Sequence, residues 1–113
     1  MIHDHLRTLG MPTHIKGYRY TVCAVRCLVE DPSNADAVVK GLYADVAEQC
    51  DATPSKVERA IRHAIEVVWE RGDIRTLEEF FGNSVSANKG KPTNSEFLTR
   101  IAMQIRLELG EAF

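Results

Sequence analysis

Apolar residues recur every three or four positions along most of the chain, which is the spacing of one face of an α-helix. Glycine, proline and polar clusters separate the periodic segments. The predicted helices are Ile2–Leu9, His14–Glu30, about Asn34–Leu42, about Ala44–Cys50, Val57–Arg71, Ile74–Phe81 and a last one from the capping-box pattern Thr93-Asn94-Ser95-Glu96 to about Leu109. The alternation typical of strands does not extend beyond a few residues anywhere. The pattern therefore predicts an all-α domain of six or seven helices.

The clearest helical periodicity lies between Ser55 and Arg71. One side of this helix is apolar and consists of Val57, Ala60, Ile61, Ala64, Ile65, Val68 and Trp69. The opposite side carries Ser55, Glu58, Arg59, Arg62 and Glu66, as the 3.6-residue repeat requires. Gly72 follows at the position of a C-terminal cap. We expect one buried and one exposed face.

The segment Tyr43–Arg62 has the layout of a helix-turn-helix: a short helix, a tight turn and a longer helix. Ala47 is a small residue where the two helices would cross. Asp51 occupies the turn position that favours a left-handed backbone, and Pro54 suits the first turn of the second helix. The inner faces would be formed by Val46, Cys50, Val57 and Ala60.

The outer face of the second helix carries groups that can read DNA bases. Arg59 and Arg62 can each bind guanine through O6 and N7, and Glu58 can accept from cytosine N4. Ser55, Lys56 and the helix N-terminus suit phosphate contacts. An ordinary solvated surface is the alternative, with Glu58–Arg62 and Arg62–Glu66 ion pairs and a capping box between Ser55 and Glu58. The pattern alone leaves both interpretations open.

The chain has 113 residues, enough for a single domain, and a formal net charge of −2. This charge argues against coating DNA through bulk attraction, but not against a local basic face. Two basic groups are found, one formed by Lys56, Arg59 and Arg62 with His63 beside them, the other by Lys89 and Lys91. The segment Glu30–Asp51 is acidic by contrast.

Other chemistry has weak sequence support. The three cysteines, Cys23, Cys27 and Cys50, form no CxxC pair and are expected to be buried, reduced thiols. A few histidines near the N-terminus, among them His3 and His5, are a weak pattern for a metal site. We expect no metal and no cofactor. The chain has no glycine-rich phosphate loop, HExxH or GxSxG motif, so we expect no enzyme.

Neither a membrane span nor a secretory signal is found in the sequence. The N-terminus lacks an apolar core segment, and the longest apolar stretches are a few residues. We therefore expect a cytoplasmic protein.

Three stretches, in order, resemble one known family: GMPTHIKGYRY (Gly10–Tyr20), SKVERAIRHAIEVVWERG (Ser55–Gly72) and KPTNSEF (Lys91–Phe97). They are similar to the C-terminal effector domain of the sporulation master regulator of endospore-forming Firmicutes, and the likeness covers nearly the whole chain. The resemblance implies a six-helix domain that binds sporulation boxes of the type TGTCGAA. It also implies head-to-tail homodimers on tandem boxes and contact with RNA polymerase sigma subunits.

The resemblance also implies residue roles. Glu58, Arg59 and Arg62 match the base-reading residues of the family. The residues implied near the DNA backbone are Ser55, Lys56, His63, Lys89, Lys91, Asn94 and Ser95. Lys56 replaces an arginine of the family, which keeps the charge but loses the planar fork of donors.

Domain organisation departs from the family pattern. Family members carry an N-terminal phosphoacceptor receiver domain, and residues 1–113 are expected to form a single effector domain without one. The alternative function is a receiverless interaction module that pairs with a full-length regulator and modulates it.

Overall fold

The computed structural model describes residues 1–31, 39–82 and 90–110, and these form six helices. The helices are α1 (Ile2–Leu9), α2 (Lys16–Glu30), α3 (Val39–Gln49), α4 (Pro54–Arg71), α5 (Ile74–Phe81) and α6 (Asn94–Glu108). No strand occurs in these three ranges, so the predicted all-α class is confirmed. None of the described helices combines the length and the apolar character needed to cross a membrane.

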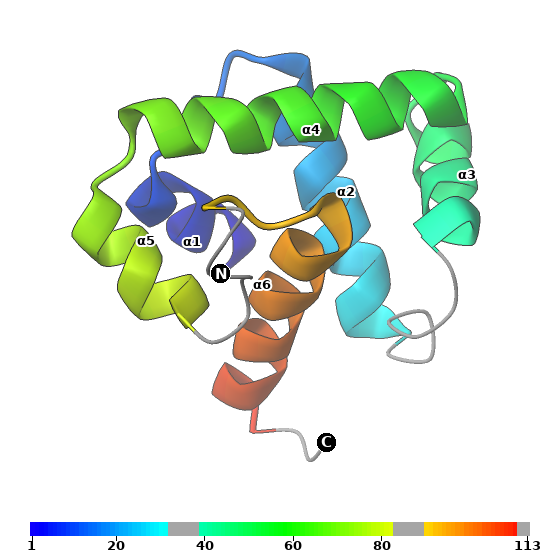
Figure 1. Ribbon diagram of the computed structural model, residues 1–113. Coiled ribbons are helices and arrows are strands. Elements are labelled where there is room, and N and C mark those ends of the chain that lie inside the picture. The colour runs from blue at the N-terminus through cyan, green and yellow to red at the C-terminus, as the bar shows by residue number, and fades with distance from the viewer. Residues whose placement is uncertain (32–38, 83–89, 111–113) are drawn as a thin grey trace.

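Helix α2 lies at the centre of the fold and packs against α4, α6, α3 and α1 (Figure 1). The long α4 lies across one end of α2, with α3 at its N-terminal end and α5 at its C-terminal end. Side chains from all these helices form one core, and its largest fully buried members include Phe81, Phe97, Leu6, Ile61 and Ile65. Burial of this apolar surface is the main favourable contribution to folding. The packing fixes α4 along one edge of the molecule, where its polar side faces outward.

Gly17 permits an unusually close crossing of α2 and α4. A Cβ atom at this position would lie 2.3 Å from the Ala60 carbonyl oxygen and 2.6 Å from the Ala64 Cβ. No side chain fits at such distances, so glycine lets the two backbones come into direct contact. Helix α4 is therefore seated directly on α2.

The acidic segment before the turn forms one helix where the pattern predicted two. Helix α3 runs without interruption over Val39–Gln49, so the predicted break at Tyr43 is wrong. Leu42, Tyr43, Val46 and Ala47 are all buried, and their spacing places them on one helical face. A single buried face gives the chain no reason to break. The rest of the earlier predicted helix, 34–38, lies outside the described residues.

Gly72 ends α4 as predicted, but for a different reason. Its φ of −73° is not left-handed. Instead, a Cβ atom would lie 2.6 Å from the Val68 carbonyl oxygen and 2.7 Å from the Leu9 carbonyl oxygen. The position requires glycine because the end of α1 approaches the backbone there.

Aromatic rings connect the C-terminal end of α4 to α5 and α6. Phe81 and Phe97 stack with ring centroids 5.2 Å apart, and Trp69 packs 5.3 Å from Phe81. Phe81 and Phe97 are fully buried, whereas Trp69 and Phe80 are half-buried and packed against the core. Trp69, which the sequence placed on the apolar side of α4, therefore packs against the core.

Candidate nucleic-acid interface

A tight turn joins α3 to α4. Asp51 has a φ of 53° and is the one non-glycine residue with positive φ among the described residues. The turn closes through the Ala52 N–H, which donates to the Ala47 carbonyl oxygen at 2.9 Å. The left-handed position predicted at Asp51 is confirmed.

Thr53 caps the N-terminus of α4. Its Oγ1 accepts a hydrogen bond from the Lys56 N–H at 3.3 Å, and Pro54 follows in the first turn, as predicted. The alternative interpretation included a capping box between Ser55 and Glu58, and this part of it is wrong, because the cap is Thr53. The Glu58 side chain is exposed and has no capping role.

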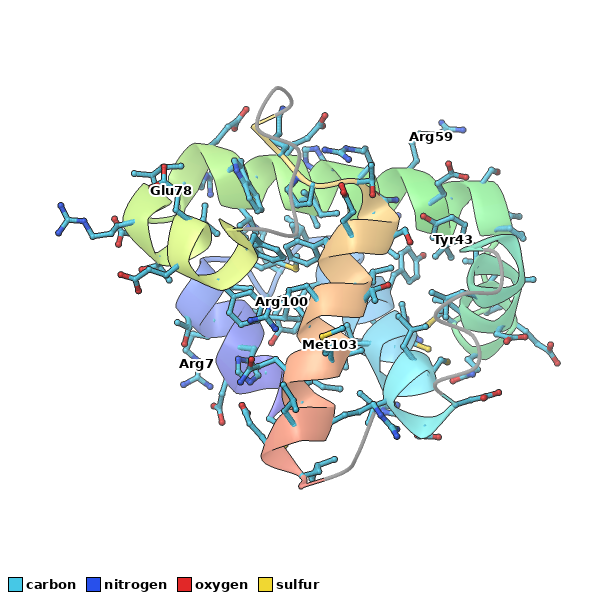
Figure 2. The ribbon with its side chains drawn as sticks, turned by 60° about the horizontal axis from the view of Figure 1, so that its bottom comes forward. Arg7, Tyr43, Arg59, Glu78, Arg100 and Met103 are labelled. Carbon is cyan, nitrogen blue, oxygen red and sulfur yellow. The ribbon has the colours of Figure 1, made fainter. Side chains whose placement is uncertain are left out.

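The facing sides of α3 and α4 are apolar. Val46, Ala47 and Val57 are buried, and Cys50 and Ala60 are half-buried. Because these residues face the protein, Ser55, Lys56, Glu58, Arg59 and His63 are left exposed on α4. Figure 2 shows Arg59 pointing away from the body of the molecule beyond α4.

Arg62 lies on the same outer side but is tied to the protein. Its Nη1 donates to the Pro92 carbonyl oxygen at 3.0 Å, and its Nε lies 3.8 Å from a carboxylate oxygen of Glu66. The Arg62 side chain is 36% exposed. Arg62 therefore connects α4 to the segment that precedes α6.

A hollow of about 480 Å³ lies at the junction of α3, α4 and α6. Its lining residues are Tyr43, Ser55, Glu58, Arg59, Arg62 and Asn94. Three of the lining residues are the predicted base readers, and hydroxyl, guanidinium and carboxylate groups share the surface. The predicted readers are thus brought together by the fold.

Asn94 has a different place from the one predicted. It is 8% exposed, and its Nδ2 donates to the Tyr43 hydroxyl at 2.9 Å and to the Glu58 carbonyl oxygen at 3.1 Å. This side chain is turned into the protein, so the predicted phosphate contact through it does not fit the structure. Its partner Tyr43 was not predicted as a site residue, although its position one turn before Ala47 places it on the face toward α4.

Burial raises the pKa of the Tyr43 hydroxyl more than its hydrogen bond with Asn94 lowers it. The phenol therefore stays neutral at physiological pH. A neutral hydroxyl can accept from Asn94 while keeping its own proton.

The predicted capping box at the start of α6 is confirmed. Thr93 Oγ1 accepts from the Glu96 N–H at 3.1 Å, and a Glu96 carboxylate oxygen accepts from the Thr93 N–H at 2.8 Å. Lys91 precedes this cap and is exposed, and Ser95 is half-buried. Lys89 lies outside the described residues.

The three cysteines are free and lie where α2 meets the end of α3. Cys23 is buried and donates to the side-chain oxygen of Gln49 at 3.3 Å, while the nitrogen of Gln49 donates to the Cys27 sulfur at 3.6 Å. Burial and the neighbouring thiols raise the pKa of Cys23 to about 12. This thiol is therefore protonated and unreactive, as expected for a buried, reduced cysteine. Cys27 and Cys50 were also expected to be buried, but both are only half-buried.

The N-terminal histidines bond to other side chains. His3 Nδ1 lies 2.7 Å from the Tyr18 hydroxyl, and His5 Nε2 lies 2.8 Å from a Glu108 carboxylate oxygen. In the described ranges no three His, Cys, Asp or Glu side chains are grouped as a metal site would need.

A short helix, a left-handed turn and a longer helix with an apolar inner and a polar outer side define a helix-turn-helix DNA-binding domain. The sequence comparison agrees with this class. Residues 2–105 match the family described as "Sporulation initiation factor Spo0A C terminal". The chain belongs to this family, and it is a sporulation-related DNA-binding effector domain.

Proposed function

We propose that this domain reads sporulation-box DNA by placing the N-terminal half of α4 in the major groove. The observation that carries the proposal is the exposed row of Ser55, Glu58 and Arg59, continued one turn later by Arg62, on the second helix of a helix-turn-helix. Arg59 and Arg62 are about 4.5 Å apart along the helix axis, so they can reach neighbouring base pairs.

The proposed base contacts follow from the chemistry of the three side chains. Arg59 is exposed and can place two donors on one guanine. Arg62 has five N–H donors, so its bond to Pro92 leaves others for a base. Glu58 can accept from a cytosine amino group and would reject bases that present an acceptor there.

The proposed backbone contacts surround these readers. Ser55 and Lys56 lie at the N-terminus of α4, where the helix dipole favours a phosphate. The remaining proposed contacts are His63, Lys89, Lys91 and Ser95. The exposed Lys91 is positioned beside α4 through the bond between Arg62 and Pro92.

Further parts of the proposal come from the family. Residues 1–113 would act as one effector domain, pair head to tail as a homodimer on tandem boxes and contact a sigma subunit of RNA polymerase. Binding to chromosomal DNA implies a cytoplasmic location. The matched family is a DNA-binding regulatory family, which supports a non-enzymatic role. The alternative, an interaction module that modulates a full-length regulator, needs no exposed row of base-reading groups and is not favoured.

Fluorescence anisotropy with labelled duplexes tests the proposal. The duplexes would carry two TGTCGAA boxes, one box or a scrambled sequence, each at 50 and 200 mM salt. We expect tighter binding to boxes than to the scrambled duplex at both salt concentrations, and tighter binding to two boxes than to one.

The matched variants are Arg59→Ala and Arg71→Ala, which remove exposed arginines from opposite ends of α4. Only the Arg59 variant should show a weaker preference for boxes over the scrambled duplex. Equal binding of all three duplexes by the unmodified chain would refute the proposed function.

A further inference from the structure

Asn94 joins three helices at one point. Both hydrogens of its amide nitrogen are used, one toward Tyr43 on α3 and one toward the Glu58 backbone on α4, while Asn94 itself begins α6. Figure 2 shows Tyr43 lying between α3 and the start of α6. The Glu58 carbonyl belongs to the turn of α4 that carries the proposed readers.

A second tie lies one turn along the same helix. Arg62 donates to the carbonyl oxygen of Pro92, a buried residue two positions before Asn94. The start of α6 therefore holds α4 at Glu58 and at Arg62, which are both proposed base readers. The apolar residues of α6 that follow Asn94 are the ones that pack in the core. Asn94 itself contributes hydrogen bonds and not apolar packing.

The arrangement has a cost. The Oδ1 atom of Asn94 is buried and has no hydrogen-bond partner among the residues that the structure describes. A buried polar atom without a partner destabilises a fold, and an apolar side chain would avoid this penalty. The two hydrogen bonds of the Asn94 nitrogen fix the position and orientation of α4 relative to α3. An apolar side chain has no directional bonds and could not do this.

We propose that Asn94 is a positioning residue of the DNA-binding face: its amide fixes the reading turn of α4 relative to α3, and so sets sequence discrimination. The inference rests on the proposed function of α4. Hydrogen bonds to base edges require donor and acceptor within about 3 Å and good alignment, so a small rotation of α4 weakens them. Nonspecific phosphate attraction tolerates the same rotation, because it depends on charge and not on alignment.

The experiment measures the ratio of dissociation constants for scrambled and two-box duplexes. Asn94→Ala removes both bonds, and we expect this ratio to fall roughly tenfold, the loss of about one good base contact. Binding to the scrambled duplex at low salt should change by less than about twofold, because no phosphate contact is removed. Tyr43→Phe removes only the bond to α3 and should lower the ratio by a smaller factor.

A stability control separates positioning from simple loss of fold. Leu6→Val shortens a fully buried side chain on α1, away from the DNA-binding face. All variants are measured at a temperature where circular dichroism shows them folded. If Asn94→Ala does not fold, Tyr43→Phe alone tests the positioning role. We expect Leu6→Val to keep the full ratio.

The outcomes distinguish the two proposals. The positioning role alone is overturned if the unmodified chain prefers boxes and the folded Asn94 and Tyr43 variants keep the same ratio of dissociation constants. An equal loss of discrimination in Leu6→Val also overturns it, since stability would then explain the effect. An unmodified chain with no box preference overturns the proposed function and this inference together.

Discussion

Arg62 has partners inside the protein as well as a proposed partner on DNA. Its guanidinium bonds to Pro92 and lies near Glu66, whereas Arg59, one turn earlier, projects away from the protein. Two arginines that look equivalent in the sequence thus differ in what they do for the folded domain. Arg62 contributes to the fold, and both contribute to the proposed readout.

Replacing each arginine by alanine should show this difference. Arg59→Ala and Arg62→Ala should each cost about 1–3 kcal/mol of binding to a box and relax preference at one or two base pairs. Arg62→Ala should also lower the free energy of unfolding by about 1 kcal/mol, because it removes a hydrogen bond. Binding-site selection and chemical denaturation measure the two effects. An unchanged selected sequence for either variant would refute its reading role.

The backbone at Asp51 gives a second prediction at this scale. Its φ of 53° disfavours residues with a Cβ atom, and aspartate tolerates it better than alanine does. Asp51→Ala should lower the free energy of unfolding by about 1 kcal/mol, and Asp51→Gly should leave it unchanged or raise it. Urea denaturation measures the free energy of unfolding of the two variants. A glycine variant less stable than the alanine variant would contradict the left-handed backbone at Asp51.

At the scale of the elements, a helix or turn could be predicted from the sequence where neighbouring residues alone determine it. Helix α4 was recognisable because its apolar repeat continues from Val57 to Trp69 and a glycine, Gly72, follows soon after it. The unbroken α3 was divided in the prediction, although Leu42, Tyr43, Val46 and Ala47 have helical spacing and are buried together. The turn at Asp51 followed from local backbone preference, which needs no tertiary information.

The candidate site shows the same division. The outward row on α4 follows from helical geometry, so Glu58 and Arg59 could be named from the sequence. The bond between Tyr43 and Asn94 joins residues 51 positions apart, and no local pattern indicates it. Resemblance alone placed Asn94 on the DNA backbone, whereas tertiary packing placed its side chain inside the protein.

The crossing of α2 and α4 gives a prediction for the elements. Gly17→Ala would place a methyl group against the Ala60 carbonyl, so the helices must separate, and we expect a loss of about 1–3 kcal/mol of stability. Gly41→Ala is the matched control, since nothing lies within 4 Å of its added Cβ on α3. The control should stabilise the domain by about 0.5–1 kcal/mol, because alanine favours helix more than glycine does. Thermal melts that shift in the same direction would contradict the close crossing.

At the scale of the whole molecule, the positive charges matter by their location and not by their sum. The chain carries a net charge of −2, yet Lys56, Arg59 and His63 are exposed together on α4, with Lys91 on the neighbouring segment. A local basic face on a weakly acidic protein predicts binding that depends on salt but requires correct orientation.

Lys91 tests this view. Lys91→Ala should weaken binding evenly to boxes and scrambled duplexes, and it should reduce the slope of log K against log salt by about one unit. Lys16→Ala, which removes an exposed lysine at the start of α2, is the matched control and should keep the slope. A loss confined to the box duplex would show that Lys91 reads bases instead of neutralising a phosphate.

The bond between His5 and Glu108 connects the two ends of the described chain. His5 lowers the pKa of Glu108, so the carboxylate stabilises the fold at pH values above the usual glutamate range. This stabilisation is lost as the pH falls through the lowered pKa. It should be small, because the pair is near the surface.

Melting temperatures of the unmodified chain and Glu108→Gln should therefore differ most near pH 6 and converge toward pH 3. Glu79→Gln, which changes an exposed carboxylate on α5, should show no such convergence. A constant difference between the unmodified chain and Glu108→Gln at all pH values would contradict the role of the His5–Glu108 pair.

The tie between Arg62 and Pro92 has a consequence for changing the DNA preference of this domain. A library of variants at position 62 would alter the recognised bases and would also release the segment that carries Lys91. Many of these variants would bind DNA poorly because the segment is released and not because of the new base contact. A library at position 59 would change one contact and leave the scaffold intact. Reprogramming should therefore begin at Arg59, and position 62 should be varied only together with the residues that begin α6.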